Sequence, residues 1–294
     1  MYIKIPATSA NLGPGFDSLG VALSLCNEVK IEHGSYTSIS IKGEGSDKPR
    51  FKKNNTFVNI FYEIYQELVG KKDNFRFEFV NNIPFSRGLG SSSSVVVGAI
   101  ASAYHMAELK VDKDVVVSKA LAFESHPDNI TPAAFGGFIS AVIHEGRVYK
   151  VKKEMPKDVC AVVVVPNTPM STEHSRTLLP KQYKMSETVF NVSHSSLLSA
   201  AFVSENWELL KIASMDKMHE DLRMQALPEL FDVRKIAYEN GAFSSTLSGS
   251  GSSFLNITCK ENSSKLAKVL KNSFKEFKIL ELEFDNLGFE ITKS

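Results

Sequence analysis

The sequence has few cysteines, and none of them are paired at the spacing of a metal or redox site. Among its 294 residues only Cys26, Cys160 and Cys259 occur, an odd number and far apart. A disulfide framework and a zinc site built from C-x-x-C pairs are therefore not expected. The three thiols suit a reducing compartment, so we expect a cytoplasmic protein.

The sequence also lacks an excess of charge of either sign, and it lacks long apolar runs. The 34 lysines and arginines nearly balance the 33 aspartates and glutamates, leaving a net charge of +1. No field over the whole molecule would attract a nucleic acid or an acidic membrane, so any bound anion must be held by local groups. The chain has no stretch of 18 apolar residues and no basic segment leading into an apolar one, so we expect neither a membrane protein nor an exported one.

Apolar residues make up 43% of the chain and charged residues 23%, as in globular proteins of about two domains. Thr56 to Val69 places its apolar residues on one face of a helix that Gly70 would end. We expect strands at 2–5, 28–32, 37–42, 74–80, 159–165, 254–259 and 278–284, and further helices at 95–106, 112–123, 187–205, 206–215, 229–240 and 263–276. Strands and helices mixed in this way indicate an α+β protein. A lysine-rich stretch at 149–156 suggests a surface crossing between domains 1–150 and 151–294.

The strongest motif is the glycine- and serine-rich stretch from Pro84 to Ser94, followed by small residues at helical spacing. Glycines allow a backbone to approach a ligand closely, and the start of a helix offers free N–H groups to an anion. The alternative is a flexible linker, or a strand through Val95. The stretch matches neither a Walker A motif nor G-x-G-x-x-G after a βαβ opening strand.

Three other stretches gather polar or small residues. Pro6 to Gly20 holds Asn11 and Asp17 in a turn-rich segment, where the alternative is a plain turn with Asp17 capping a helix. Ser244 to Phe254 is a second Gly/Ser loop, otherwise a hairpin turn. His174, Arg176 and Arg223 are further candidates in the second half, although isolated arginines usually lie on the surface.

The last stretch crowds Glu124, His126, Asp128 and Asn129 into six positions before an apolar strand. Glu124, with a serine of the glycine loop, could supply the oxygen ligands that Mg²⁺ prefers. Alternatively, Asp128 and Asn129 form only a turn and Glu124 is a solvated carboxylate. A zinc site at His126 is not expected, because no second His or Cys stands at ligand spacing.

Taken together and in this order, the four stretches resemble the GHMP small-molecule kinases, and within them the homoserine kinase family. The resemblance covers essentially the whole chain. It implies an N-terminal domain with a left-handed crossover, a ferredoxin-like C-terminal domain, and an active site between them. It also implies Mg-ATP-dependent phosphorylation of the side-chain hydroxyl of L-homoserine in threonine biosynthesis. Apart from the resemblance, we expect a homodimer.

The resemblance assigns roles to individual residues of this chain. The nucleotide would be held by Pro84, Arg87, Gly88, Leu89, Gly90, Ser91, Ser92, Ser93, Ser94, Gly249 and Gly251. Mg²⁺ would be held by Ser92 and Glu124. Homoserine would be bound by Asn11, Asp17, His126, Arg176 and Arg223, with Asp17 at its ammonium and the two arginines at its carboxylate. Catalysis would fall to Ser92, Glu124, Asp128 and Asn129.

Two points stay open at this stage. Asp128 is a candidate base, yet a phosphate oxygen could accept the hydroxyl proton instead, and Arg87 could contact a phosphate or only solvent. Other functions remain possible as well: another GHMP kinase acting on a mevalonate-like or sugar substrate, or a non-catalytic binding protein of the same fold. Loss of the metal pair would favour the last, but Ser92 and Glu124 are both present.

Overall fold

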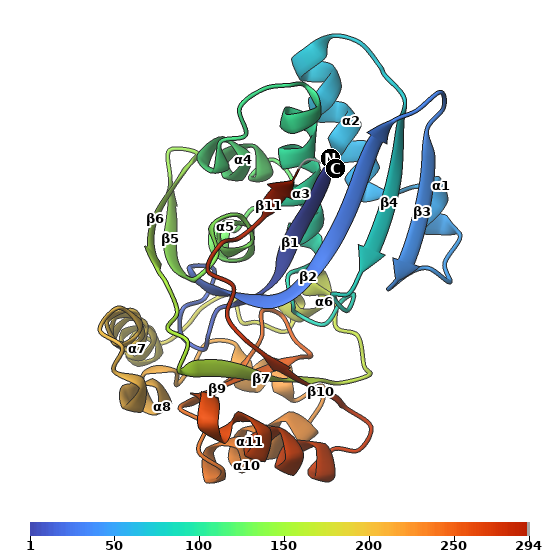
Figure 1. Cartoon of the computed structure of the whole chain (residues 1–294). Helices are drawn as coiled ribbons and strands as arrows, with labels where there is room; N and C mark the ends of the chain where they lie inside the picture. Colours follow the sequence, from blue (N-terminus) through green and yellow to red (C-terminus); the bar gives the residue numbers. More distant parts are fainter. Residues whose placement is uncertain (293–294) are drawn as a thin grey trace.

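Two β-sheets organise the chain, and an apolar layer lies between them (Figure 1). The fold is described for residues 1–292 from a computed structural model. The first sheet contains β1 (Tyr2–Ala10), β2 (Leu19–His33), β3 (Ser38–Gly43), β4 (Phe75–Asn81), β5 (Phe138–His144), β6 (Arg147–Lys153) and β11 (Glu290–Thr292). The second contains β7 (Val159–Val165), β8 (Ser244–Leu247), β9 (Phe254–Cys259) and β10 (Lys278–Leu282). The expected α+β class is confirmed.

The long strand β2 holds the first sheet together. It pairs antiparallel with β1 along most of its length. Its last residues, Glu28 to His33, also pair with β4, and its first residues, Leu19 to Val21, pair with β5. Strands β3 and β4 are parallel, so the chain between them, with α1 (Arg50–Lys53) and α2 (Thr56–Val69), forms a crossover. The loop between β1 and β2 lies at the end of the sheet that faces the second domain.

Helices cover one face of the first sheet. Besides α2 these are α3 (Ser91–Met106), α4 (Lys113–Ala120) and α5 (Pro127–Phe135). The expected helix α2 begins and ends where its sequence predicts: the Asn55 side chain accepts a hydrogen bond from the N–H of Val58, and Gly70 ends the helix with φ of +73°. Its apolar face packs against β4, where Phe61 contacts Phe75 and Phe77 edge to face.

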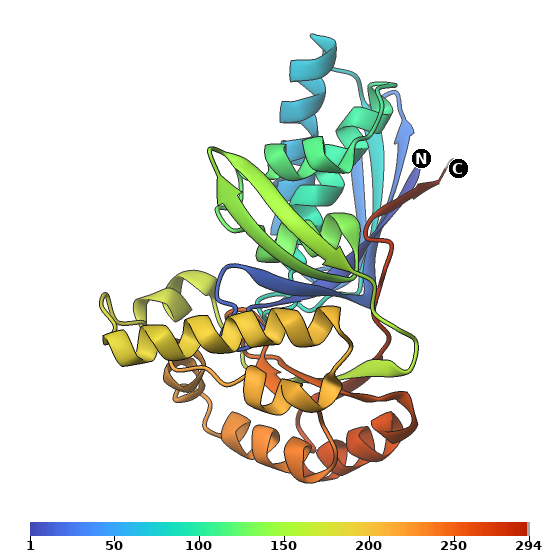
Figure 2. The ribbon, with the colours of Figure 1, turned by 90° about the vertical axis from the view of Figure 1, so that its left-hand side faces the viewer.

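The second domain has the ferredoxin-like topology expected from the resemblance. All its strand pairs are antiparallel, in the order β10-β7-β9-β8. Its helices are α6 (Thr172–Thr177), α7 (Met185–Val203), the 3-10 turn η1 (Trp207–Leu209), α8 (Leu210–Ala213), α9 (Glu220–Met224), α10 (Glu229–Glu239) and α11 (Lys260–Ser273). Helices α10 and α11 cover the outer face, and α7 lies beside the junction of the domains (Figure 2).

Strand β7 connects the second domain to the first, because its two faces pack against different layers. Val162 and Val164 pack toward α10 and α11, whereas Val163 and Val165 belong to the layer shared with the first domain. Because both faces are covered, all seven residues of β7 are buried. Much of the lysine-rich stretch forms β6, and the chain crosses between the sheets over the shorter segment 154–158.

Candidate active site

The loop that leads from β4 into α3 depends on two glycines. Gly88 and Gly90 have φ values of +75° and +64°, in the left-handed region that glycine adopts without strain. A Cβ at Gly88 would lie 2.0 Å from the carbonyl oxygen of Ser248, and one at Gly90 would lie 1.9 Å from Oγ1 of Thr8. Gly90 precedes the first turn of the 16-residue helix α3, whose N–H groups lack intrahelical partners. This turn borders a cavity and suits an anion.

The four serines after Gly90 have different surroundings. Ser91, Ser92 and Ser93 line the cavity, but Ser94 is buried and donates a hydrogen bond to the carbonyl of Ser91 at 2.9 Å. The Ser93 hydroxyl donates to Oε2 of Glu124 at 2.7 Å. The resemblance assigns Ser92, together with Glu124, to Mg²⁺. In the structure Ser93 is hydrogen-bonded to Glu124, and Ser92 borders the same cavity.

Glu124 and these hydroxyls are hard oxygen ligands of the kind that Mg²⁺ accepts. Within residues 1–292, no group of three or more His, Cys, Asp or Glu could hold a metal ion. Magnesium in proteins is often bound through one or two carboxylates together with substrate phosphates. The donors therefore fit an ion that arrives with a nucleotide.

Asp128 and Asn129 lie in the first turn of helix α5 and not in an isolated turn. Asp128 is 5% exposed, and burial, with smaller contributions from Asp17 and Glu124, raises its pKa to about 7. The Asn129 side-chain oxygen accepts a hydrogen bond from the Thr8 hydroxyl at 2.7 Å. A carboxyl group with a pKa near 7 can exchange a proton with a substrate at neutral pH.

Asp17 lies on the loop between β1 and β2, with φ of +55°, and caps no helix. One of its carboxylate oxygens accepts a hydrogen bond from Nη2 of Arg176 at 2.7 Å. The other lies 3.2 Å from Nε2 of His126. Burial lowers the pKa of His126, which favours a neutral ring near pH 7.

Arg223 enters the cavity from α9 and is 2% exposed. No carboxylate among the described residues lies within 4.0 Å of it, although Asp17, Asp216 and Glu220 are near enough to act on its charge. Burial lowers its pKa to about 10, which leaves it charged at neutral pH. Its Nη1 donates to the Gly249 carbonyl at 3.2 Å. A buried cation without an ion-pair partner is a favourable place for a substrate carboxylate.

The second Gly/Ser loop joins the two domains at the cavity. The Gly249 carbonyl also accepts a hydrogen bond from Nδ2 of Asn11 at 3.0 Å, and Oδ1 of Asn11 accepts one from the N–H of Asp17. The Ser248 hydroxyl donates to the Gly88 carbonyl at 2.7 Å. The side-chain amide of Asn11 is thus engaged in hydrogen bonds that fix the loops around the cavity.

Arg87 is turned toward the second domain. Its Nε donates to the carbonyl of Pro166 at 2.8 Å, and its terminal nitrogens donate to the carbonyls of Phe85 and Asn167. Because these donors are already engaged, Arg87 fastens the glycine loop to the segment after β7.

One cavity of about 270 Å³ therefore gathers the four stretches. Of the residues that the sequence singled out for the site, all line it except Ser94, His174 and Gly251. Sequence reasoning missed five further lining residues: Ser86, Met170, Ser171, Thr172 and Ser250. Ser86 and Ser250 lie inside stretches that were recognised, and their positions alone could have suggested them. The other three follow β7 without any local pattern, and only the folding of the second domain brings them to the cavity.

Family models place the GHMP kinases N-terminal domain at residues 55–137 and the GHMP kinases C-terminal domain at 198–277. Homoserine kinases from Campylobacter concisus and Nitratiruptor sp. are 59% and 57% identical to this chain, over 100% and 99% of both proteins. This chain belongs to the homoserine kinase family of the GHMP kinases. A crystal structure of homoserine kinase from Cytophaga hutchinsonii, 25% identical, covers 99% of this chain and 97% of its own with a TM-score of 0.88. The family resemblance is thus confirmed, and the homoserine kinase fold extends over both domains.

Proposed function

We propose that this chain transfers the γ-phosphoryl group of ATP to the side-chain hydroxyl of L-homoserine, giving O-phospho-L-homoserine and ADP. The observation that carries the proposal is the joining, in one cavity, of an anion-binding helix start with a carboxylate and two arginines suited to an amino acid. The full-length similarity to curated homoserine kinases supports the same substrate.

ATP would place its phosphates against the glycine loop and the first turn of α3. An adjoining cavity of about 580 Å³ shares Ser86, Arg87, Ser91 and Ser92 with the first and is lined by Phe51, Phe57, Phe79 and Phe85. Its aromatic walls suit the base of the nucleotide, because flat apolar surfaces pack well on rings. Because the two cavities share these residues, one ATP molecule could place its base in the second cavity and its phosphates in the first.

Homoserine would bind through its two charged groups. Asp17 offers a carboxylate to the ammonium, and Arg176 and Arg223 offer guanidinium groups to the carboxylate. Charge-assisted hydrogen bonds of this kind are strong and directional. A mevalonate-like or sugar substrate would leave Asp17 without an ammonium to bind.

The transfer itself needs positioning and charge neutralisation more than covalent help. The homoserine oxygen forms a bond to the γ-phosphorus, the bond from that phosphorus to the β,γ-bridging oxygen breaks, and ADP leaves. The hydroxyl proton would pass to Asp128, whose pKa of about 7 suits this role. Glu124, with Ser92 and Ser93, would hold Mg²⁺, which when bound neutralises phosphate charge.

An ADP-release assay with Mg-ATP tests the proposal, using homoserine, threonine, mevalonate and galactose as acceptors. Turnover with homoserine well above the other three is the expected result. Preference for mevalonate or galactose would assign a different substrate, and no turnover with any acceptor would indicate a non-catalytic relative.

We also propose a homodimer in the cytoplasm. Met185, Val189 and Val192 leave apolar side chains exposed along α7, which a second copy could cover. Cys26, Cys160 and Cys259 are all free thiols, as suits a reducing compartment. No helix within residues 1–292 is long and apolar enough to cross a membrane. Light scattering at micromolar concentration would test the dimer.

A further inference from the structure

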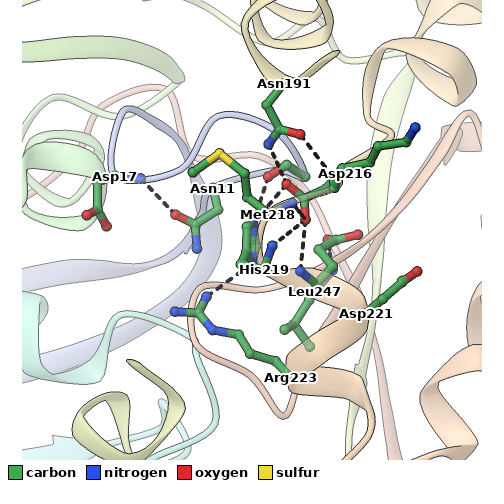
Figure 3. Close-up of polar contacts among 12 residues, drawn as sticks. Asn11, Asp17, Asn191, Asp216, Met218, His219, Asp221, Arg223 and Leu247 are labelled. Atoms are coloured by element: carbon green, nitrogen blue, oxygen red, sulfur yellow. Dashed lines mark hydrogen bonds and ion pairs between the residues drawn. The ribbon is translucent and has the colours of Figure 1, made fainter. Parts of the chain in front are cut away.

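Arg223 is held in place by a histidine one helical turn earlier in the chain (Figure 3). His219 is 1% exposed, and its Nδ1 lies 3.1 Å from Nη1 of Arg223. The Phe16 ring lies against both side chains. Its centroid is 5.1 Å from the centroid of the imidazole and 5.3 Å from the guanidinium carbon. These contacts leave the buried guanidinium few alternative positions.

The hydrogen bonds of His219 allow only one arrangement of its protons. Its Nε2 lies 2.8 Å from the Gly13 carbonyl oxygen, which can only accept, so Nε2 must carry a hydrogen. Arg223 can only donate, so Nδ1 must offer a lone pair. A neutral ring protonated at Nε2 satisfies both partners. Burial lowers the pKa of His219, and the nearby Arg223 cation adds to this effect, whereas Asp216 opposes it.

His219 is itself fixed by Asp216. Oδ2 of Asp216 accepts hydrogen bonds from the N–H groups of Met218, His219 and Glu220 at 2.7 to 3.0 Å, and Oδ1 accepts one from Asn191 at 2.6 Å. The short helix α9 therefore starts from a buried carboxylate anchored to α7. The Gly13 carbonyl ties the same histidine to the loop between β1 and β2 of the first domain.

We propose that His219 is a positioning residue for the substrate carboxylate, acting through Arg223. It accepts the hydrogen bond of one guanidinium nitrogen and so fixes the orientation of that guanidinium in the cavity. The inference rests on the proposed function, in which Arg223 binds the carboxylate of homoserine. Nothing in it requires His219 to touch the substrate.

Two substitutions separate the two hydrogen bonds of His219. His219→Gln keeps an N–H near the position of Nε2 but removes the acceptor that faces Arg223. His219→Asn keeps an oxygen near the position of Nδ1 but removes the bond to Gly13. We expect His219→Gln to raise KM for homoserine about 10-fold, the range of a lost hydrogen bond to a charged group. Its kcat and its KM for ATP should change less than about threefold, and His219→Asn should keep KM for homoserine within about threefold.

A double-mutant cycle tests whether the effect runs through Arg223. Arg223→Met keeps the side-chain volume but removes every donor, and in that background His219→Gln should raise KM for homoserine less than about twofold. His144→Gln, an exposed histidine on the β5–β6 hairpin, is the matched control and should behave as wild type. An equal rise of KM for ATP and for homoserine, or a full effect in the Arg223→Met background, would show a merely structural role and overturn the inference.

A measurement on the unaltered protein does not depend on the variants folding. Nitrogen-15 shifts of the His219 ring should report a neutral imidazole protonated at Nε2, with homoserine bound or absent. A ring protonated at Nδ1 would overturn the inference, because that ring cannot accept from Arg223. Wild-type protein that turns over no homoserine would overturn the proposed function as well, whereas normal turnover with an unchanged His219→Gln variant would overturn this inference alone.

Discussion

The carboxylate of Asp17 and the guanidinium of Arg176 lie 2.7 Å apart although 159 positions separate them in the chain. Asp17 belongs to the loop between β1 and β2, and Arg176 to α6 of the second domain. These two charges neutralise each other. An amino acid brings one charge of each sign, so it can exchange partners with this ion pair while the net charge of the cavity stays the same. A neutral alcohol offers no such exchange.

Removing Arg176 should therefore weaken binding of the amino acid and spare the nucleotide. Arg176→Ala should lower kcat/KM for homoserine about 10- to 100-fold, since a charge-assisted hydrogen bond is worth about 1.5–3 kcal/mol. KM for ATP should move less than about threefold. Steady-state kinetics with each substrate varied in turn measure both, and Arg147→Ala on the exposed β5–β6 hairpin is the control.

Combining this change with Arg223→Met should be non-additive, because both arginines would bind one carboxylate. Homoserine lactone, which has no free carboxylate, should distinguish poorly between wild type and either variant. Wild-type kcat/KM for homoserine in both single variants would remove the two arginines from the substrate site.

The glycine loop should not tolerate a side chain at Gly90. Gly90→Ala meets Oγ1 of Thr8 in addition to the strain of a positive φ, whereas Gly70→Ala has the strain alone, with nothing within 4 Å of the new Cβ. We expect the Gly90 variant to raise KM for ATP at least about tenfold, and both variants to lose on the order of 1 kcal/mol of stability from strain. ATP titrations and thermal melts compare them. Equal ATP affinity in the two variants would remove the loop from the nucleotide site.

Magnesium dependence should reveal the role of Glu124. Glu124→Gln keeps the shape of the side chain but removes its charge, so a higher Mg²⁺ concentration should be needed for half-maximal activity, and kcat should fall. A magnesium titration at saturating ATP and homoserine measures this, and Glu63→Gln on the exposed face of α2 is the control. An unchanged titration would leave Glu124 as no more than the hydrogen-bond partner of Ser93.

Asp128 should impose an acidic limb on the pH profile. Its pKa of about 7 means that the accepting carboxylate is lost as pH falls below 7, so kcat/KM should decrease there about tenfold per pH unit. Asp128→Asn should remove this limb and lower kcat about 100-fold or more. A loss below tenfold would assign the proton to a phosphate oxygen instead.

The same residue should make stability depend on pH in a stated direction. Because its folded pKa is raised from 3.8, the folded protein holds a proton that the unfolded chain has released, and the free energy of unfolding falls as pH rises from about 4 to 7. Asp128→Asn abolishes this contribution. Thermal melts of both proteins at pH 5 and pH 8 should therefore show a smaller decrease for the variant.

Local patterns in the sequence predicted those helices and strands whose stabilising contacts are also local. Helix α2 could be placed from Thr56 to Val69 because its apolar residues share one face and Gly70 follows its last residue. Helix α5 was missed, because Pro132 stands inside it and its short sequence is apolar on most sides. There the packing of the first domain, and not helical periodicity, decides the structure.

The site shows the same division. Glycine-rich loops and clustered carboxylates are visible within a few consecutive residues, so the stretches around Gly88 and Glu124 could be found in the sequence. That Ser93 faces Glu124, or that Arg87 is turned toward Pro166, depends on side-chain directions set by neighbours far away in sequence. The role of His219 could not be read from the sequence, since only Arg223 lies near it in the chain and its other partner, Gly13, lies 206 positions away in the first domain.

Strand β11 has a consequence for the order in which the protein can be made. Residues 290–292 pair with β1, and Phe289 is buried in the core of the first domain. A ribosome that has released only the first 150 residues thus presents a sheet with one edge uncovered and a core that lacks an aromatic ring. The first domain is completed by residues 289–292, which follow the second domain in the chain, so its final folding step waits until the second domain has been synthesised.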